Sequence, residues 1–185
     1  MFFKFLYPFN YVKNVFIIDY KKLFESGYKA VIFDIDNTLV HHGDDSTPEV
    51  DDLFKYIHSC GLKTLLVSNN SEERIQRFIK NIDSEYIYDA HKPNPKNYTE
   101  AVKKLGVKKS EAVFVGDQIF IDILGANLSG IPSILVDFIR LDTETYYGKR
   151  RDLEAIILKF YKKSKSSQNR IGDIEKEEMT ENVVV

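Results

Sequence analysis

Two aspartates lie two positions apart directly after a short apolar run. The run reads Lys-Ala-Val-Ile-Phe over residues 29–33, and Asp-Ile-Asp-Asn-Thr follows it over residues 34–38. On an extended chain, side chains two apart face the same way, so Asp34 and Asp36 are expected to point into one site. Neighbouring carboxylates repel unless a cation or a shared proton relieves the repulsion. Mg²⁺ suits such a hard oxygen site, above all where a phosphate shares the ion.

Two further polar groups follow apolar runs later in the chain. Ser68 and Asn69 come directly after residues 62–67, and a hydroxyl with backbone amides at a helix start can bind phosphate. Lys92 follows a short candidate strand at 86–89, where its charge could pair with a phosphate and with the carboxylates. Each has an ordinary alternative when taken alone, namely a helix cap for the first and a solvated surface lysine for the second.

The fourth polar group ends the apolar run at 112–115. Gly116 and Asp117 follow this run, and Asp122 lies in the helix expected next. Glycine lets the backbone approach a ligand closely, Asp117 would complete a metal shell, and Asp122 could orient it through water or Lys92. A strand-end turn with a helix cap is the ordinary alternative. The four groups nevertheless follow successive strands in order, which favours one shared site over four unrelated turns.

The elements that must position these residues alternate along the chain from residue 29 to about residue 136. The expected strands cover 29–34, 62–67, 86–89, 111–115 and 131–136, and the expected helices begin near Ser46, Ser71, Asn94 and Ile119. Such alternation predicts an α/β fold, a parallel sheet covered by helices on both faces. Right-handed crossovers then place the carboxyl ends of all strands at one edge, where ligands bind in such sheets.

The composition is that of an ordinary globular domain. The 185 residues are 43% hydrophobic and 29% charged, with a net charge of −2. This length favours one domain, and the balanced charge gives no support for dedicated binding of DNA or RNA. Cys60 is the only cysteine, which excludes an intramolecular disulfide and a cysteine-rich metal site and fits a cytoplasmic protein.

The two ends of the chain differ from this central part. Aromatic residues crowd the segment 1–28, but polar residues interrupt its apolar run, so we expect neither a transmembrane span nor a signal peptide. We expect this segment either to pack on the core or to lie on a membrane surface. The globular domain is expected over 29–161, and the residues from 162 to 185, rich in Lys, Ser, Glu and Asn, are expected to form a disordered charged tail.

With these motifs, the sequence resembles the haloacid dehalogenase (HAD) superfamily of phosphotransferases over about residues 29–136. Its four motifs are matched by residues 34–38, Ser68, Lys92, and Gly116-Asp117 with Asp122. The resemblance implies a Rossmann-like fold and a Mg²⁺-dependent phosphatase. The ester would be hydrolysed in two steps through an aspartyl-phosphate.

The resemblance also implies a role for each matched residue. Asp34 would be the nucleophile, and Asp36 the general acid and then the general base. The implied phosphate-binding residues are Thr38, Ser68, Asn69 and Lys92, of which Lys92 also stabilises charge during catalysis. The implied Mg²⁺ ligands are Asp34, the backbone carbonyl of Asp36, and Asp117, with Gly116 and Asp122 in support.

The spacing of the motifs leaves no room for a cap domain. Ser68 follows Asp36 by 32 positions, and Lys92 follows Ser68 by 24. An open site suits a large or surface-held substrate. The chain is more closely similar to the YqeG-type subgroup of HAD subfamily IIIA, which is related to mitochondrial phosphatidylglycerophosphate phosphatases. The segments that carry this similarity are 11–12, 27–29, 36–40, 67–70, 92–93 and 116–127.

The subgroup implies dephosphorylation of phosphatidylglycerophosphate to phosphatidylglycerol, with peripheral contact at the inner membrane face. Lys4 and Lys13 could meet anionic headgroups, and Arg140 and residues 149–151 form either a basic rim or ordinary surface charge. The pair at 41–42, His-His, is expected in a solvated loop at the rim. Two other interpretations stay open, a soluble phosphatase acting on phosphoprotein, nucleotide or nucleic-acid ends, and a non-catalytic interaction module.

Overall fold

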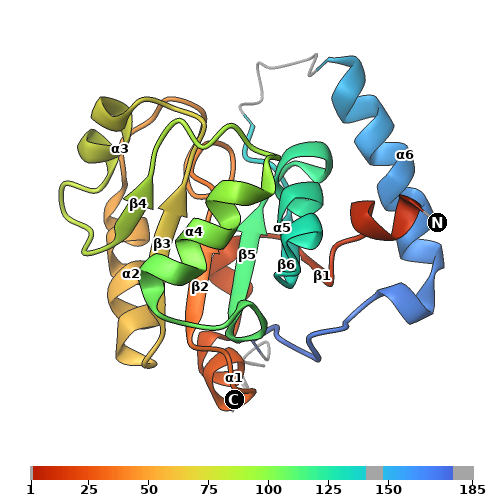
Figure 1. Cartoon of the computed structure of the whole chain (residues 1–185), viewed down its shortest axis with the longest axis horizontal. Helices are drawn as coiled ribbons and strands as arrows, with labels where there is room; N and C mark the ends of the chain where they lie inside the picture. The colour runs from red at the N-terminus through yellow and green to blue at the C-terminus, as the bar shows by residue number, and fades with distance from the viewer. Residues whose placement is uncertain (1, 141–147, 177–185) are drawn as a thin grey trace, which may run out of the picture.

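The computed structural model describes residues 2–140 and 148–176 and contains a six-stranded parallel sheet (Figure 1). The strands are β1 (Asn10–Val12), β2 (Ala30–Phe33), β3 (Lys63–Val67), β4 (Glu85–Ile87), β5 (Ala112–Gly116) and β6 (Ser133–Val136). Their order across the sheet is β1-β6-β5-β2-β3-β4, and all neighbouring pairs are parallel. The predicted α/β class and parallel sheet are therefore confirmed.

Helices cover both faces of the sheet, as the alternating pattern predicts. They are α1 (Tyr20–Glu25), α2 (Pro48–Ser59), α3 (Glu72–Phe78), α4 (Pro95–Leu105), α5 (Leu124–Ser129) and α6 (Lys149–Lys163). Within β2, Val31 and Phe33 join a core cluster with α1, α2 and α3, whereas Ala30 and Ile32 join another with α4 and α5. Because successive strand residues face opposite sides, a fully apolar β2 can serve both layers.

The helices begin where the sequence places their caps. Thr47, which directly precedes Pro48, accepts a hydrogen bond through its side chain from the Val50 amide. The Ser71 side chain accepts one from the Arg74 amide. Asn94 caps α4, which ends at Gly106 in the left-handed conformation. The side chains thus satisfy amides that the first helical turn leaves unpaired.

Within the inter-motif segment 37–91, which is described without a gap, the structure has only α2, β3, α3 and β4. The predicted absence of a cap domain in this segment is therefore confirmed, and the carboxyl edge of the sheet stays open there.

The helix expected over 119–129 is divided in two. Ile119–Ile123 (η4) is a π-helix that precedes α5, and the amide of Ile123 donates to the carbonyl of Gln118 over 3.1 Å. The buried Tyr98 of α4 donates its hydroxyl to the Ile121 carbonyl over 2.9 Å. This outside donor satisfies a carbonyl of η4, and the local sequence carries no sign of it.

Replacing Gly125 with alanine is expected to destabilise the protein by about 1–3 kcal/mol through overpacking. A Cβ at this position would lie 2.4 Å from the Tyr98 ring, which is fully buried between α4 and α5. Urea unfolding measures the loss, and equal stability of Gly125→Ala and wild type would contradict the prediction.

The aromatic N-terminal segment packs against the core over much of its length. β1 adds a parallel edge strand beside β6, and Leu6, Val12, Val15 and Ile18 are buried. The 3₁₀ turns η1 (Phe2–Leu6) and η2 (Val15–Ile17) flank this strand. A strand of three residues is too short for its alternation to be recognised in sequence, which is why β1 was not predicted.

Part of the predicted tail is folded, so the expectation of disorder from residue 162 is wrong for residues 162–176. After α6 and a short turn, η5 (Lys165–Ser167), the chain returns to the N-terminal segment. Arg170 donates to the carbonyls of Tyr7 and Pro8, and Ile174 is buried. These contacts join residues about 160 positions apart, so the sequence of this segment has no local apolar period that would reveal them. The rest of the predicted tail, residues 177–185, lies outside the described part of the chain.

Helix α6 was also not predicted. Its inward face carries charged residues, Arg151 and Glu154, beside apolar ones, which blurs the helical period. No helix in the described ranges is both long and apolar enough to cross a bilayer.

Candidate active site

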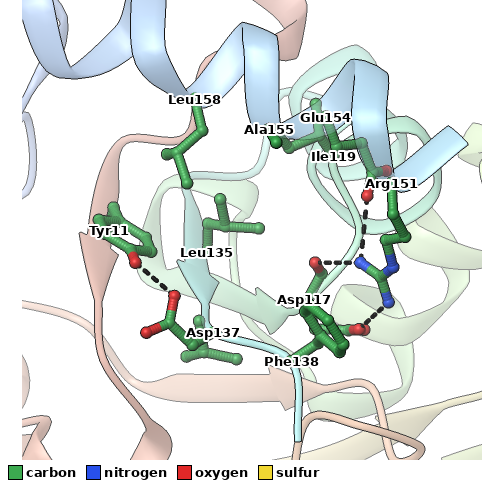
Figure 2. A pocket seen from close by; sticks show the side chains of 11 residues that line it. Tyr11, Asp117, Ile119, Leu135, Asp137, Phe138, Arg151, Glu154, Ala155 and Leu158 are labelled. Atoms are coloured by element: carbon green, nitrogen blue, oxygen red, sulfur yellow. Dashed lines mark hydrogen bonds and ion pairs between the residues drawn. The ribbon is translucent and has the colours of Figure 1, made fainter. Parts of the chain in front are cut away.

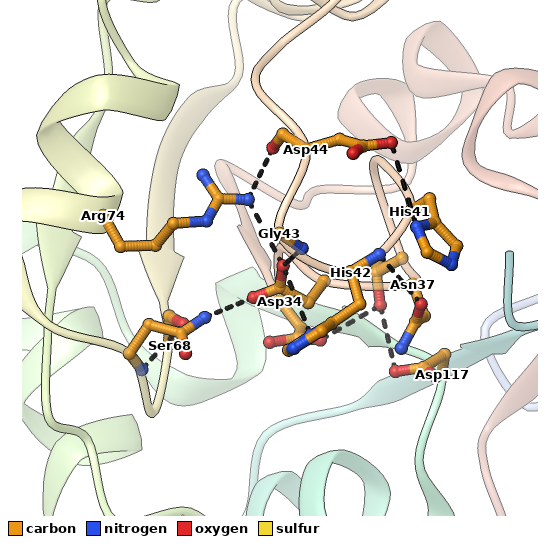
Figure 3. A network of polar contacts seen from close by, with 12 residues as sticks. Asp34, Asn37, His41, His42, Gly43, Asp44, Ser68, Arg74 and Asp117 are labelled. Carbon is orange, nitrogen blue, oxygen red and sulfur yellow. Dashed lines mark hydrogen bonds and ion pairs between the residues drawn. The ribbon is translucent and has the colours of Figure 1, made fainter. Parts of the chain in front are cut away.

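The polar residues that follow the strands meet at the carboxyl edge of the sheet, where they line a cavity of about 150 Å³. Among its lining residues are Asp34, Asp36, Ser68, Asn69 and Lys92. Figure 3 shows Asp34 and Ser68 approaching this space from neighbouring strands, with Asp117 close by. The structure therefore brings the four sequence motifs together at one place.

Lys92 lies between two buried aspartates. Its Nζ donates to the Asp34 carboxylate and to Asp122 Oδ1, the latter over 2.8 Å. Burial alone would lower the pKa of Lys92, but the carboxylates of Asp122 and Asp34 outweigh it and raise the pKa above the usual lysine value. Lys92 is thus held as a cation next to the group proposed to attack phosphorus.

Burial raises the pKa of Asp34 to about 6, against the lowering effect of Lys92, and the nearby Asp122 charge adds to the rise. Burial likewise raises the pKa of Asp117 to about 8, again with a contribution from Asp122. Burial is the larger cause of both shifts, and Asp122 adds to each, because Asp34, Asp117 and Asp122 have only Lys92 and Arg151 as cationic partners among the described residues and so leave an excess of negative charge. A further cation would relieve this excess.

The donor set fits a hard divalent cation. Asp34, Asp117 and Asp122 are buried, and each offers a carboxylate oxygen within 4.8 Å of the others. Oxygen donors of this kind suit hard divalent cations such as Mg²⁺, Ca²⁺ and Mn²⁺. The Asp36 side chain is not part of this cluster; the sequence-based assignment gives the metal only the Asp36 backbone carbonyl.

Asp36 is surrounded by hydrogen-bond donors. Its Oδ1 accepts from the Gly43 amide at 2.8 Å and from Arg74 Nη2 at 3.2 Å, and its Oδ2 accepts from Asn70. Arg74 reaches this place from the first turn of α3 (Figure 3). Sequence analysis did not identify Arg74, because no local signal distinguishes it from Arg77 of the same helix.

The predicted phosphate-binding residues have different surroundings. Thr38 Oγ1 lies 3.3 Å from both Asp34 Oδ2 and Asp117 Oδ1, between two of the carboxylates. Ser68 Oγ accepts from the Asn70 amide over 3.1 Å. Asn69 Oδ1 accepts from the Lys92 amide over 2.7 Å, so Asn69 supports the loop that carries Lys92.

Gly116 allows the end of β5 to approach Asp122. A Cβ at this position would lie 2.5 Å from both Cβ and Cγ of Asp122. Asp122 Oδ2 also accepts from the Gln118 amide over 3.0 Å. The glycine therefore leaves the room in which Asp122 can bind Lys92.

Arg151 of α6 binds the predicted metal ligand Asp117. It donates to the Asp117 carboxylate and, over 2.8 Å, to its carbonyl, while Glu154 lies 3.1 Å away (Figure 2). The guanidinium also lies 4.8 Å from the centre of the Phe138 ring. Of the basic residues considered as a rim, Arg151 is at the site, whereas Arg140, Lys149 and Arg150 are exposed.

The His41-His42 pair lies in the loop after the first motif, as expected. His42 is 69% exposed, and its Nδ1 is 3.7 Å from Asp36 Oδ1. His41 Nδ1 lies 3.9 Å from Asp44. Neither histidine belongs to the carboxylate cluster, and of the two only His42 lines the cavity.

Replacing Arg151 with methionine is expected to lower the free energy of unfolding by about 2–4 kcal/mol, because it leaves buried Asp117 and Glu154 without their cation. The side chain of Arg151 is only 16% exposed in this pair. Urea unfolding measures the effect. Arg150→Met is the matched control, since Arg150 is exposed and adjacent, and equal stabilities for the two variants would contradict this account.

Comparisons with known proteins identify relatives of this chain. A family model described as haloacid dehalogenase-like hydrolase matches residues 41–130. "Probable phosphatase YqeG" of Bacillus subtilis is 40% identical over 134 residues, which cover 72% of this chain and 78% of that protein. Glyceraldehyde 3-phosphate phosphatase of Methanopyrus kandleri is 51% identical over 45 residues, 24% of this chain and 19% of that one.

An uncharacterized protein from Listeria monocytogenes serotype 4b has a similar solved structure, with a TM-score of 0.51. The two share 20% identity over 74% of this chain and 99% of that one, a likeness that shows the fold alone. The family assignment rests on sequence, because the Bacillus protein is similar over more than three quarters of its own length. The chain belongs to the haloacid dehalogenase-like hydrolase family.

Proposed function

We propose that this hydrolase is a phosphomonoesterase that carries the phosphoryl group on Asp34 between two chemical steps. The observation that carries the proposal is the position of the Asp34 carboxylate, which lines the cavity at the end of β2 with Lys92 bound to it. A carboxylate in this position can attack phosphorus, and splitting the reaction through an acyl phosphate replaces one difficult step with two easier ones.

The first step transfers the phosphoryl group. An oxygen of Asp34 forms a bond to phosphorus, the bond from phosphorus to the ester oxygen breaks, and Asp36 gives that oxygen a proton. Lys92 offsets charge on the phosphoryl oxygens, and the hydroxyls of Thr38 and Ser68 hydrogen-bond to them. Asn70 and Arg74 orient the Asp36 carboxylate during this step.

The second step releases phosphate. Asp36, now ionised, accepts a proton from the water that attacks phosphorus, and the bond between phosphorus and Asp34 breaks. Asp34 is restored as a carboxylate and inorganic phosphate leaves. The same side chain thus serves as acid and then as base, which requires that it remain within reach of both the ester oxygen and the water.

Asp34, Asp117 and the Asp36 carbonyl would hold Mg²⁺, with Asp122 in support. When bound, a divalent ion neutralises charge on the transferring phosphoryl group. The buried carboxylate cluster supports a cation at this place.

The proposed substrate is phosphatidylglycerophosphate, and the proposed location is the inner face of the membrane. An open cavity at the sheet edge, with no cap over residues 37–91, supports a phosphate presented by a large or surface-held molecule. Similarity to the YqeG-type subgroup supports the lipid over a soluble ester.

The test measures phosphate release from phosphatidylglycerophosphate in mixed micelles with Mg²⁺, beside glycerol phosphate and an aryl phosphate. Faster release from the lipid than from either soluble ester is expected. Turnover of the soluble esters alone would keep the chemistry and reject the substrate, whereas release that persists in Asp34→Asn would refute Asp34 as the nucleophile.

Replacing Asp36 with asparagine is expected to slow turnover by about 10²–10⁴-fold, because the acid and the base are both lost. Breakdown of the phosphorylated Asp34 should slow as well, so acid-labile phosphoenzyme should accumulate with an activated aryl phosphate, whose departure needs little protonation. Asp44→Asn is the control, since its side chain is 64% exposed at the rim. Wild-type rates in Asp36→Asn would remove Asp36 from the mechanism.

A further inference from the structure

Helix α6 presents apolar side chains to solvent on the face opposite its contacts with the active site. Leu153, Ile156 and Phe160 are 54%, 49% and 60% exposed. Their spacing of three and four residues places them along one stripe. Arg151 and Glu154 instead face Asp117 and η4. The apolar stripe is therefore a second surface of α6, separate from the one that holds the site.

The stripe borders an apolar groove of about 660 Å³ between α6 and the N-terminal segment. Its lining residues are Leu6, Tyr7, Phe120, Leu153, Ile156, Ile157 and Phe160. Figure 1 shows η1 next to α6 at this side of the molecule. Phe5 of η1 is also 41% exposed, so apolar surface extends over two elements that are far apart in sequence.

Basic residues outnumber acidic ones beside this apolar surface, where Asp152 is the exposed acidic residue of α6. α6 contains six basic and two acidic residues, in a chain whose net charge is −2. Lys149 and Lys163 lie seven residues before and after Ile156, which puts them on the same helical face at the two ends of the stripe. Lys159 is exposed beside it. A helix with apolar residues between cationic ends fits an anionic membrane surface.

We propose that α6 and η1 form a docking surface for an anionic lipid bilayer, which we call the α6 face: Phe5, Leu153, Ile156 and Phe160 with Lys149 and Lys163. Apolar side chains enter the headgroup region, and the lysines pair with lipid phosphates. The positive ends favour this occupant over a second copy of the chain, because two such faces would bring like charges together.

The α6 face and the contact with the active site lie on opposite sides of the same helix. Arg151 binds Asp117 at the carboxyl end of β5, and Leu153, two residues later, is exposed to solvent. The docking itself does not depend on the proposed substrate.

Vesicle binding by the full chain tests the α6 face. Sedimentation with phosphatidylcholine vesicles that contain phosphatidylglycerol should recover the protein, and vesicles of phosphatidylcholine alone should not. Phe160→Ser should lower the partition coefficient about tenfold through lost apolar burial. The double variant Lys149→Glu with Lys163→Glu should lower the partition coefficient about tenfold or more. Added salt should weaken vesicle binding by the wild-type protein.

Matched controls separate the α6 face from the rest of the surface. Phe24→Ser in α1 changes a phenylalanine that is 45% exposed, and Lys103→Glu in α4 changes a lysine that is 80% exposed. Both should bind vesicles within about twofold of wild type, since single exposed residues outside the face contribute little. Hydrolysis of a soluble aryl phosphate by Phe160→Ser should stay at the wild-type rate, because Phe160 does not line the active-site cavity.

Several results would overturn the proposal. They are wild-type protein that ignores phosphatidylglycerol, unchanged binding by Phe160→Ser, or equal losses in the controls. A dimer that Phe160→Ser dissociates, without vesicle binding, would assign the face to a second copy. Vesicle binding by a protein that hydrolyses no phosphate ester would instead count against the proposed function and leave the docking surface standing.

Discussion

Replacing Asp34 with asparagine is expected to reduce phosphate release by about 10⁴-fold or more, since losing a nucleophile removes the covalent route entirely. The amide keeps the volume of the carboxylate and can still contact Lys92 and Thr38. Lys92 also retains Asp122 as a partner. The measurement is steady-state phosphate release together with trapping of acid-labile phosphoenzyme, and both signals should disappear.

Stability distinguishes loss of chemistry from loss of fold. Burial disfavours ionised Asp34, whose pKa rises to about 6, so a neutral amide should leave the free energy of unfolding within about 1 kcal/mol of wild type. Asp52→Asn is the control, because its side chain is 74% exposed on α2. Phosphoenzyme that still forms in Asp34→Asn would place the nucleophile at another residue.

The central fold was predictable because its signals are local. Strands β2, β3, β5 and β6 are short runs rich in apolar residues, and α2, α3 and α4 begin at side chains that cap their first turn. Parallel order then follows from the alternation of strands and helices. Asp34, Ser68 and Asp117 were predictable for the same reason, since each directly follows a strand, whereas Lys92 comes five residues after β4.

The parts of the fold and of the site that sequence analysis did not predict depend on contacts between distant segments. Arg170 is held by carbonyls at the other end of the chain, and Ile174 is buried by a segment more than 150 residues earlier. Arg151 resembles any surface arginine until α6 is placed against β5. Arg74 likewise becomes recognisable only beside Asp36. Non-local partners of this kind leave no period or spacing in the sequence.

The two arginines, Arg74 and Arg151, also explain why the sequence motifs understate the positive charge of the site. The motifs alone supply four aspartates and one lysine, whereas Arg74 contacts Asp36 and Arg151 contacts Asp117. Each aspartate that lines or supports the cavity therefore has a cationic neighbour from the protein. Lys92 contacts two of these aspartates, Asp34 and Asp122, so the loss of its charge would leave both without this cation.

Replacing Lys92 with methionine is expected to lower the free energy of unfolding by about 3–5 kcal/mol in metal-free protein, because two buried carboxylates lose their shared cation. Its Nζ is bound to both Asp34 and Asp122, and the side chain is 3% exposed. Phosphate release should fall about 10²–10³-fold, as for other losses of a preorganised charge that stabilises a transition state. Urea unfolding in a chelator and steady-state kinetics measure the two effects.

Mg²⁺ gives this variant a signature that a simple packing defect would lack. In Lys92→Met, an added divalent ion is the remaining cation available to Asp34 and Asp122, so Mg²⁺ should raise the melting temperature more than it does in wild type. Lys96→Met is the control, since Lys96 is exposed on the adjacent helix α4 and should change neither stability nor the Mg²⁺ response. No rise in melting temperature with Mg²⁺ in either protein would mean that the carboxylate cluster does not bind the ion, and equal rises in the two proteins would mean that Lys92 does not compete with the ion for these carboxylates.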